Sequence, residues 1–520
     1  MVLILVLVAG TVLALSAISH LRTATPDYRE GLVSDERPLS LNPLVGATDP
    51  SVRDVGELLY RRLLRLDDRA LPAPDLAPGV SVSQDGLTYH LPLKNGQLWS
   101  DGRAVTVADV LATVEWVQSA SFGDAASAAP WRDVHVRAEG DGVSFDLAGP
   151  RASFVAQLTQ LPILPLGSLT PVAVAALPAT AATAMATSGP FRVVSSTTTA
   201  ITLFPNSHAT TAPRLNQVEI DLFGDFASAA AAFRAGTIDA VVASDPVERS
   251  QLVSAGGGSH DIATFRFVDL LFNERGPVLS DGAVRQAIAT TIDRRALVAG
   301  PLRGMAAAQT GAVPAGLAWV GARRAPPPAA PATAASALDA AGWALAADGV
   351  RVRGTTRLQL RLAVADVAPL PDVATAIASQ LSAIGIDVQV ATRPASALRQ
   401  MLVSGGEFDM AVADWDNGPD PDVSSFWRST AVPPAGFNVS GGTVDPFLDQ
   451  ALDRLATLSD PAARAAAATS VSSQLADDLP AVFLETPEVS LVLRPGITVT
   501  IPPVGTSANR FDDIASWHRG

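Results

Sequence analysis

Cysteine is absent from the 520-residue chain, and this absence removes several kinds of protein chemistry. A chain without cysteine has no disulfide, thiolate zinc site, iron–sulfur cluster or cysteine nucleophile. A lipid anchor attached through a thioether is excluded for the same reason. Lysine occurs once, at Lys94, and asparagine follows it, so the Gly-Lys-Ser/Thr phosphate loop is missing as well.

Histidine is also scarce, with 6 residues in the chain, and no two of them lie within five positions of each other. This spacing excludes the HExxH type of zinc motif. The Gly-x-Ser-x-Gly turn that carries a nucleophilic serine does not occur either. The net charge of −14 argues against a nucleic-acid partner, because phosphate binding needs a basic surface. We therefore expect neither a metal nor a cofactor, but these absences do not exclude every enzyme, because a catalytic pair of carboxylates could lie anywhere among the 51 acidic residues.

The composition predicts a folded protein of more than one domain. Hydrophobic residues make up 48% of the chain and charged residues 17%, which is typical of ordered globular proteins. A chain of this length exceeds what one ordinary hydrophobic core supports, so we expect two or three domains.

The N-terminus carries an uncharged apolar run at 2–19, followed by His20 and Arg22. Small residues near its end, such as Ala14 and Ala17, favour a signal peptide that is cleaved. Its length favours a retained membrane anchor, because about 20 apolar residues span a bilayer. Under either interpretation, residues 1–26 direct the rest of the chain out of the cytoplasm, to the periplasm or the outer face of the membrane.

The remaining sequence alternates between strand and helix patterns, which predicts open α/β sheets. Apolar residues at three- and four-residue spacing predict a helix over 52–66, and Thr106 with Asp109 predicts a capped helix over 106–117. A further helix is expected over 281–297. Strands are expected at 86–93, 191–194, 201–204, 218–223, 240–242, 265–272, 358–365 and 387–391.

A long segment at 74–102 reads PDLAPGVSVSQDGLTYHLPLKNGQLWSDG and runs on to AVTVADV. Shorter motifs follow in order: SGPF at 188–191, AFRAGTID at 232–239, LFN at 271–273, VRQAI at 284–288, IDR at 292–294, FDM at 408–410 and GPDPD at 418–422. Together these segments resemble the family 5 extracellular solute-binding proteins, the peptide and nickel group of ABC importers.

The resemblance implies an α/β, two-lobed periplasmic-binding-protein fold of type II, similar to cluster C, with a discontinuous first lobe. Lobe I is expected over 27–265, with a subdomain at about 50–170, and lobe II over 266–479. The chain then returns into lobe I at 480–520. Strands at 265–272 and 482–492 would cross between the lobes and form the hinge, and the lobes would close on a ligand.

The expected ligand site is the segment Asp414-Trp415-Asp416-Asn417. It follows a predicted strand, and α/β sheets place ligands at the carboxyl ends of strands. The resemblance implies that a carboxylate here, Asp414 or Asp416, pairs with the α-amino group of a peptide, and that Trp415 supplies a flat apolar wall. The alternative is a turn or helix-capping aspartate beside a core tryptophan. Asn273 and Asn438 are further candidates for the cleft.

The resemblance implies a binding protein and not an enzyme. Its function would be capture of dipeptides or oligopeptides for ABC permease subunits, by a monomer associated with the membrane through its N-terminus. A nickel chelate, an opine or a sugar is an alternative ligand, because a fold does not fix a ligand. Two other functions stay open. One is an anchored sensor or interaction protein on the same fold, and the other is an exported hydrolase that uses Asp414 and Asp416.

Overall fold

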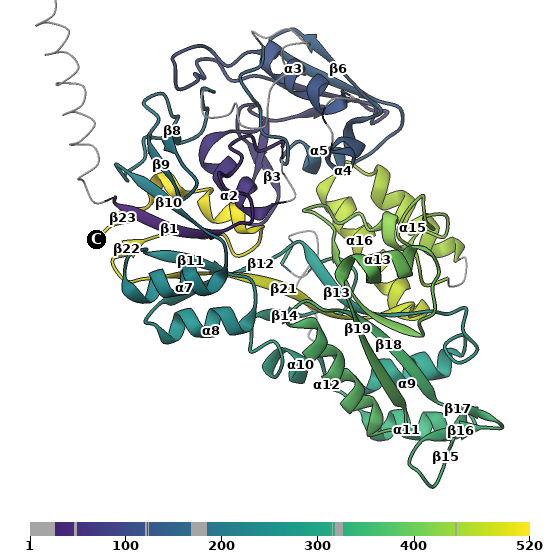
Figure 1. The fold of residues 1–520 in the computed structure, drawn as a ribbon. Coiled ribbons are helices and arrows are strands. Elements are labelled where there is room, and N and C mark those ends of the chain that lie inside the picture. The colour runs from purple at the N-terminus through teal and green to yellow at the C-terminus, as the bar shows by residue number, and fades with distance from the viewer. Residues whose placement is uncertain are drawn as a thin grey trace, which may run out of the picture.

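The structure is a computed structural model that describes residues 26–45, 49–119, 122, 124–167, 185–314, 316–317, 326–441 and 445–520. Two lobes lie one above the other, and the C-terminal strand β21 (Ala481–Leu493) runs between them in Figure 1. The leader at 2–19 lies outside the described residues. Within the described residues, no helix combines the length and the apolar character that a bilayer crossing requires.

A sheet of 12 strands runs through both lobes. Its main path is β19 (Asp387–Arg393), β18 (Gln359–Ala365), β20 (Met410–Asp416), β13 (Arg266–Phe272), β21, β11 (Ala240–Ala243), β1 (Tyr28–Val33), β10 (Val218–Phe223), β9 (Ala200–Pro205) and β8 (Phe191–Ser196). Two more strands, β12 (Gly258–Ala263) and β14 (Ala306–Ala308), also pair with β21.

Strand β21 joins the two lobes because its two halves have different partners. Its first half pairs antiparallel with β13, where Ala481 lies opposite Leu271, and with β14. Its second half pairs antiparallel with β11 and β12, where Leu493 lies opposite both Ala240 and Gly258. Both strands expected to cross between the lobes are therefore present, and they are hydrogen-bonded to each other.

Each lobe has its own hydrophobic core. The lobe I core includes Tyr89, Trp99 and Trp517, and the lobe II core includes Phe267 and Trp343. Lobe I also contains a four-stranded sheet of β4 (Ser81–Val82), β5 (Thr88–Pro92), β7 (Gly142–Leu147) and β6 (Val134–Glu139), and a pair of short strands, β22 (Ile497–Thr498) and β23 (His518–Arg519). Its α-helices are α2 (Pro50–Leu59), α3 (Val107–Gln118), α4 (Ala125–Ala128), α5 (Phe154–Gln157), α7 (Phe226–Ala235) and α8 (Pro246–Ser254). Its 3₁₀ helices are η1 (Ala129–Trp131), η3 (Ser507–Phe511) and η4 (Ile514–Ser516).

Lobe II surrounds its part of the sheet with helices. These are α9 (Gly282–Thr291), α10 (Arg294–Ala299), α11 (Pro331–Ala340), α12 (Leu370–Ser382), α13 (Ala395–Val403), α14 (Ser424–Trp427), α15 (Pro446–Thr457) and α16 (Pro461–Asp478), with a small sheet of β15 (Ala344–Leu345), β16 (Arg351–Arg353) and β17 (Thr356–Arg357). In Figure 1, α15 and α16 lie beside α4 and α5 of lobe I. The backbone N–H of Ala152 donates to the carbonyl of Ala456 (2.8 Å), so the lobes touch there.

Two predicted helices are shorter than expected. The helix predicted over 52–66 ends at Leu59, because Tyr60 is extended, and Leu64–Leu66 forms strand β2, which pairs with β3 (Pro72–Pro74). The helix predicted over 281–297 is interrupted at Ile292, and Asp293 caps a second helix through the N–H of Ala296. The capping box of Thr106 and Asp109 is formed as predicted.

Candidate functional site

Two cavities lie where the lobes face each other. Cavity A, about 420 Å³, is lined by α2, α5 and η3 of lobe I and by Asn417, Pro419 and Asp420 of lobe II. Cavity B, about 380 Å³, is lined by β1 and α2 of lobe I and by Arg266 and Asp416. Arg53 and Thr506 line both cavities, so the two spaces are neighbours. Each has the size of a small-molecule pocket.

Strand β20 delivers Asp416 and Asn417 to these cavities. The strand ends at Asp416, whose exposed side chain lines cavity B, and its Oδ1 atom accepts a hydrogen bond from the N–H of Gly418 (3.0 Å). The next residue, Asn417, lines cavity A and donates from Nδ2 to the carbonyl of Asp420 (2.5 Å). These two predicted residues are therefore brought together between the lobes, at the carboxyl end of a strand.

Asp414 lies on the same face of the sheet as Asp416, but its carboxylate is already paired with an arginine. Both of its carboxylate oxygens accept from Arg266, with Arg266 Nε to Asp414 Oδ1 at 3.0 Å. Burial raises the pKa of Asp414, and the Arg266 guanidinium offsets part of that rise. Asp414 does not line cavity A or B within the described residues. Of the two aspartates, Asp416 is the one without an ion pair among the described residues.

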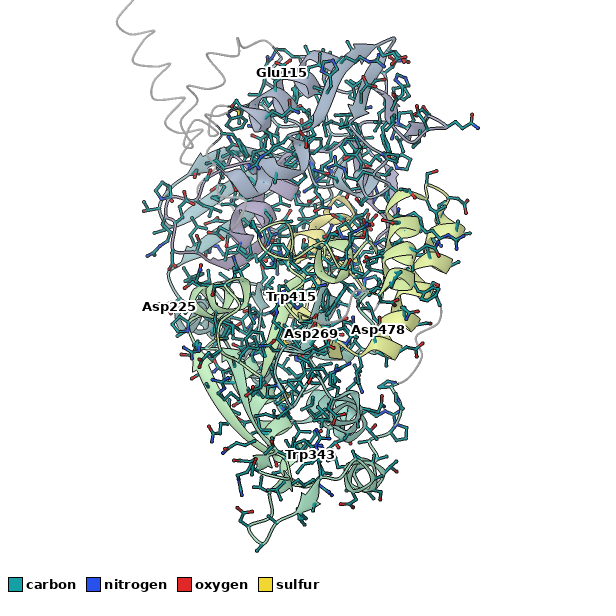
Figure 2. The ribbon with its side chains drawn as sticks, turned by 90° about the vertical axis from the view of Figure 1, so that its right-hand side faces the viewer. Glu115, Asp225, Asp269, Trp343, Trp415 and Asp478 are labelled. Atoms are coloured by element: carbon teal, nitrogen blue, oxygen red, sulfur yellow. The ribbon has the colours of Figure 1, made fainter. Side chains whose placement is uncertain are left out.

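Trp415 points to the opposite face of the sheet, since side chains alternate along a strand. Its Nε1 atom donates to Asp269 Oδ1 (3.3 Å), and Figure 2 shows the two side chains together in the middle of the molecule. Its ring packs against Phe426 and Phe437, with centroid distances of 5.3 and 6.2 Å. Trp415 is not among the described residues that line cavity A or B.

The two asparagines are placed elsewhere. Asn273 Nδ2 donates to the carbonyl of Phe408 (2.9 Å), and its Oδ1 accepts from the N–H of Arg275 (3.3 Å). Asn438 donates to the carbonyl of Arg428 (3.0 Å) and lines a separate cavity of about 390 Å³ inside lobe II. The geometry of both amides is that of loop-stabilising groups.

Two buried carboxyl groups lie in the strands that join the lobes. Asp269 on β13 and Glu485 on β21 each have one carboxylate oxygen without a hydrogen-bond partner within the described residues. Burial raises the pKa of Asp269 well above its usual range. Burial and, secondarily, the Asp414 carboxylate raise the pKa of Glu485 to about 8. In the part of the chain that the structure describes, no group of three or more histidine and acidic residues is arranged to hold a metal ion.

Sequence reasoning missed the lobe I wall of the cavities, above all Arg53 and Thr506. Arg53 is a charged residue on the polar side of a helix, and nothing in the local pattern distinguishes it from a solvated arginine. Thr506 belongs to the C-terminal return, which reaches α2 only through the fold. The one usable signal was the expectation that the segment 480–520 returns to lobe I.

Residues 72–436 match the family model described as bacterial extracellular solute-binding proteins, family 5, middle. The chain belongs to this family, and the fold is the two-lobed periplasmic-binding-protein fold expected from the sequence. A Brucella ovis protein, named as a candidate ABC transporter peptide-binding protein, is 27% identical over 417 residues, which cover 75% of this chain and 74% of the relative.

Solved structures share the fold at low sequence identity. The oligopeptide-binding protein AppA from Bacillus subtilis, in complex with a nonapeptide, has a TM-score of 0.68 at 22% identity. NikZ from Campylobacter jejuni, in complex with Ni(L-His), has a TM-score of 0.72 at 20% identity. Each alignment covers 95% of this chain and 100% of the other. These relatives are binding proteins, and the likeness to the solved structures concerns the fold alone.

Proposed function

We propose that this solute-binding protein captures a peptide between its lobes and delivers it, chemically unchanged, to the permease subunits of an ABC importer. The observation that carries the proposal is the position of Asp416, whose carboxylate lines a cavity between the lobes without an ion-pair partner among the described residues. The names of the Brucella ovis and Bacillus subtilis proteins support the peptide as ligand class.

In this proposal, Asp416 binds the ligand's α-amino group. The N–H of Gly418 orients its Oδ1 atom, and Oδ2, which accepts no hydrogen bond from the described residues, would accept one from the ligand. A carboxylate–ammonium pair is charge-assisted and directional, so it would fix one end of the peptide. Asn417 lines the neighbouring cavity, while Asp414 keeps Arg266 in place and Trp415 supports the strand from its other face.

The proposal includes the lobe boundaries, which are 27–265 with a subdomain at about 50–170, then 266–479, and then 480–520 as the return into lobe I. Each lobe's separate core and the shared strand β21 support a hinge between them. We further propose that the protein works outside the cytoplasm as a monomer, exported or anchored by residues 2–19. Membership of a family of extracellular solute-binding proteins supports this location.

The test is a thermal-unfolding screen with peptides of two to nine residues, with Ni(II)–histidine as the alternative ligand. A ligand that binds only the folded state raises the unfolding temperature progressively with concentration. We expect peptides to do so and Asp416→Asn to weaken binding about tenfold or more. The matched control is Asp141→Asn, an exposed aspartate in the turn between β6 and β7, which should leave binding unchanged. Stabilisation by Ni(II)–histidine alone would contradict the peptide proposal.

A further inference from the structure

Cavity C is the separate cavity of about 390 Å³ in lobe II that Asn438 lines. Strand β13 begins at Arg266, which lines cavity B, and ends at Phe272, just before Glu274, which lines cavity C. Because a strand rises about 3.4 Å per residue, roughly 20 Å separate its two ends. Among the described residues, none that lines cavity C also lines cavity A or B. Cavity C is therefore a site apart from the space between the lobes.

The lining of cavity C carries more negative charge than the surrounding protein neutralises. Glu274 forms an ion pair with Arg285 (3.1 Å), and both residues line the cavity. The Arg285 guanidinium also donates to several backbone carbonyls, so its remaining donors are in use. Three further carboxylates of the lining have no ion pair among the described residues, namely Asp445, Asp477 and Asp478. The cavity is thus prepared for a positive charge.

Asp445 and Asp478 lie within hydrogen-bonding distance of each other. Burial raises the pKa of Asp478, and the Asp445 carboxylate raises it further. Asp445 caps the N-terminus of α15 through the N–H of Phe447 (2.9 Å), where a negative charge is favourable. Asp478, labelled in Figure 2, is the last residue of α16, and the C-terminal end of a helix disfavours a carboxylate. Both the carboxylate pair and the helix end therefore favour a cation here.

A second, independent observation comes from Trp427 on α14, which lines the same cavity. Its side chain is only 4% exposed, yet its Nε1 atom has no hydrogen-bond partner among the described residues. A buried N–H group without an acceptor costs free energy, so an unpaired one in a native fold calls for a partner. An indole N–H is a donor only, and it needs an oxygen or another acceptor. Cavity C thus offers carboxylates to a positive group and an N–H to an acceptor.

These two contacts distinguish between the kinds of cation that could bind. A hard metal ion such as Ca²⁺ takes about six to eight oxygen ligands, and no three acidic or histidine side chains of the described residues are arranged to supply them. An ammonium group needs only a few hydrogen-bond acceptors, and its bonds to carboxylates are strong. A ligand carboxylate would be repelled by the unpaired aspartates, so the acceptor for Trp427 must be an uncharged oxygen.

We propose that cavity C is a second ligand site of this protein and binds a small amine that carries a hydroxyl group, that is, an amino alcohol. The ammonium group lies between Asp445 and Asp478, and the hydroxyl oxygen accepts a hydrogen bond from Trp427 Nε1. The inference does not rest on capture of a peptide between the lobes, because the two sites share no lining residue among those described.

The experiment follows thermal unfolding of the protein in phosphate buffer with three matched probes. Serinol carries an ammonium group and hydroxyl groups, isopropylamine is the same amine without the hydroxyls, and glycerol has hydroxyls without the amine. A ligand that binds the folded state raises the unfolding temperature with its concentration. We expect serinol to do so, and isopropylamine to need about fivefold higher concentration for the same rise, because it leaves the Trp427 N–H without an acceptor. Glycerol should act equally on the wild-type protein and on Asp478→Asn.

Substitutions assign the response to the two contacts. Asp478→Asn removes one carboxylate and should raise the serinol concentration needed for a given rise about tenfold. Trp427→Phe keeps an aromatic ring against Phe483 and removes the N–H, so serinol and isopropylamine should become equal. Asp416→Asn, in cavity B, and Asp141→Asn, in the exposed turn between β6 and β7, are the controls and should leave the serinol response unchanged.

Several outcomes would overturn the inference. Equal responses of the wild-type protein to serinol and isopropylamine would remove the role of Trp427. An unchanged serinol response in Asp478→Asn, or its loss in Asp416→Asn, would place the amine outside cavity C. Stabilisation by calcium chloride and by neither amine would identify a metal site instead. If Trp427→Phe does not fold, the comparison of both amines on the wild-type protein and on Asp478→Asn still decides. None of these results changes the test of the peptide proposal, which uses other ligands.

Discussion

Arg510 and Glu30 are 480 residues apart in the chain and are joined inside lobe I by two hydrogen bonds. The Nη2 and Nε atoms of Arg510 lie 2.6 and 2.9 Å from Glu30 Oε1, and neither side chain is exposed to solvent. Arg510 also pairs with Asp54 of α2 (2.8 Å), and Tyr28 donates its hydroxyl to Glu30. This network ties the C-terminal return to β1 and to the helix that carries Arg53.

We expect Arg510→Met to destabilise the protein strongly. The substitution leaves the carboxyl groups of Glu30 and Asp54 buried without their cation, and breaking a buried pair in this way costs about 3–5 kcal/mol. Urea denaturation measures the loss in the free energy of unfolding. Arg192→Met, which removes an exposed arginine, should change that free energy by less than about 0.5 kcal/mol. Equal effects of the two substitutions would contradict the assignment.

A second prediction concerns Glu485 and the pH dependence of stability. The carboxyl group has a pKa of about 8 in the folded protein, against an ordinary value of 4.5. Between these values the folded state holds a proton that the unfolded state has released, so the free energy of unfolding falls as the pH rises through this window. Below pH 4.5 the contribution of Glu485 is constant, and above pH 8 its loss is complete.

The variant Glu485→Gln mimics the protonated carboxyl group at every pH. We expect it to be more stable than the wild-type protein at pH 8, by on the order of 2 kcal/mol, and to show a shallower fall between pH 5 and pH 8. Denaturation curves at several pH values measure both effects. Glu115→Gln is the control, because Glu115 is exposed on α3, at the far end of lobe I in Figure 2. A variant that follows the wild-type pH profile would disprove the assignment to Glu485.

The sequence predicted most of the sheet, because its strands are short apolar or alternating runs between clear turns. The strand at 265–272 is an example, since the continuous run FRFVDLLF is typical of a strand covered on both faces. The prediction failed at 60–66, where Leu66, three residues after Leu63, belongs to the hairpin strand β2 and not to a helix. The spacing of apolar residues carries no information about the pairing of Leu64–Leu66 with strand β3, which contains two prolines.

Only part of the lining of the cavities was predicted from the sequence. Asp416 and Asn417 were expected directly after a strand and do line the cavities, but β20 continues to Asp416 and therefore includes Asp414 and Trp415. The orientation of Trp415 follows from the alternation of side chains along that strand. Arg53 could not be found, because its cavity exists only when α2, η3 and the end of β20 meet, and these segments are distant in the chain.

The capping box of α3 gives a third prediction. Asp109 accepts hydrogen bonds from the N–H of Thr106 and from the N–H of Gly167 (each 2.9 Å), and from Trp99 Nε1 (3.4 Å). We expect Asp109→Ala to lower the free energy of unfolding by about 2 kcal/mol, since several buried donors lose their acceptor. Thermal unfolding measures the effect. Asp141→Ala, on the surface of the same lobe, should have little effect. A loss below about 0.5 kcal/mol for Asp109→Ala would mean that water replaces these bonds.

The last prediction concerns closure of the lobes, and the absence of cysteine makes it directly measurable. Exposed Glu115 of lobe I and exposed Glu407 of lobe II can be replaced by cysteine and labelled with a donor and an acceptor dye, with no other thiol in the chain. The contact between Ala152 and Ala456 joins the lobes on the side of cavity A. Because a ligand bound by both lobes favours the state in which they touch, we expect saturating peptide to raise the transfer efficiency. A pair placed within lobe I, at Glu115 and Arg192, should show no change. Unchanged transfer for the pair across the lobes, under conditions where calorimetry detects binding, would exclude hinge closure as the binding mechanism.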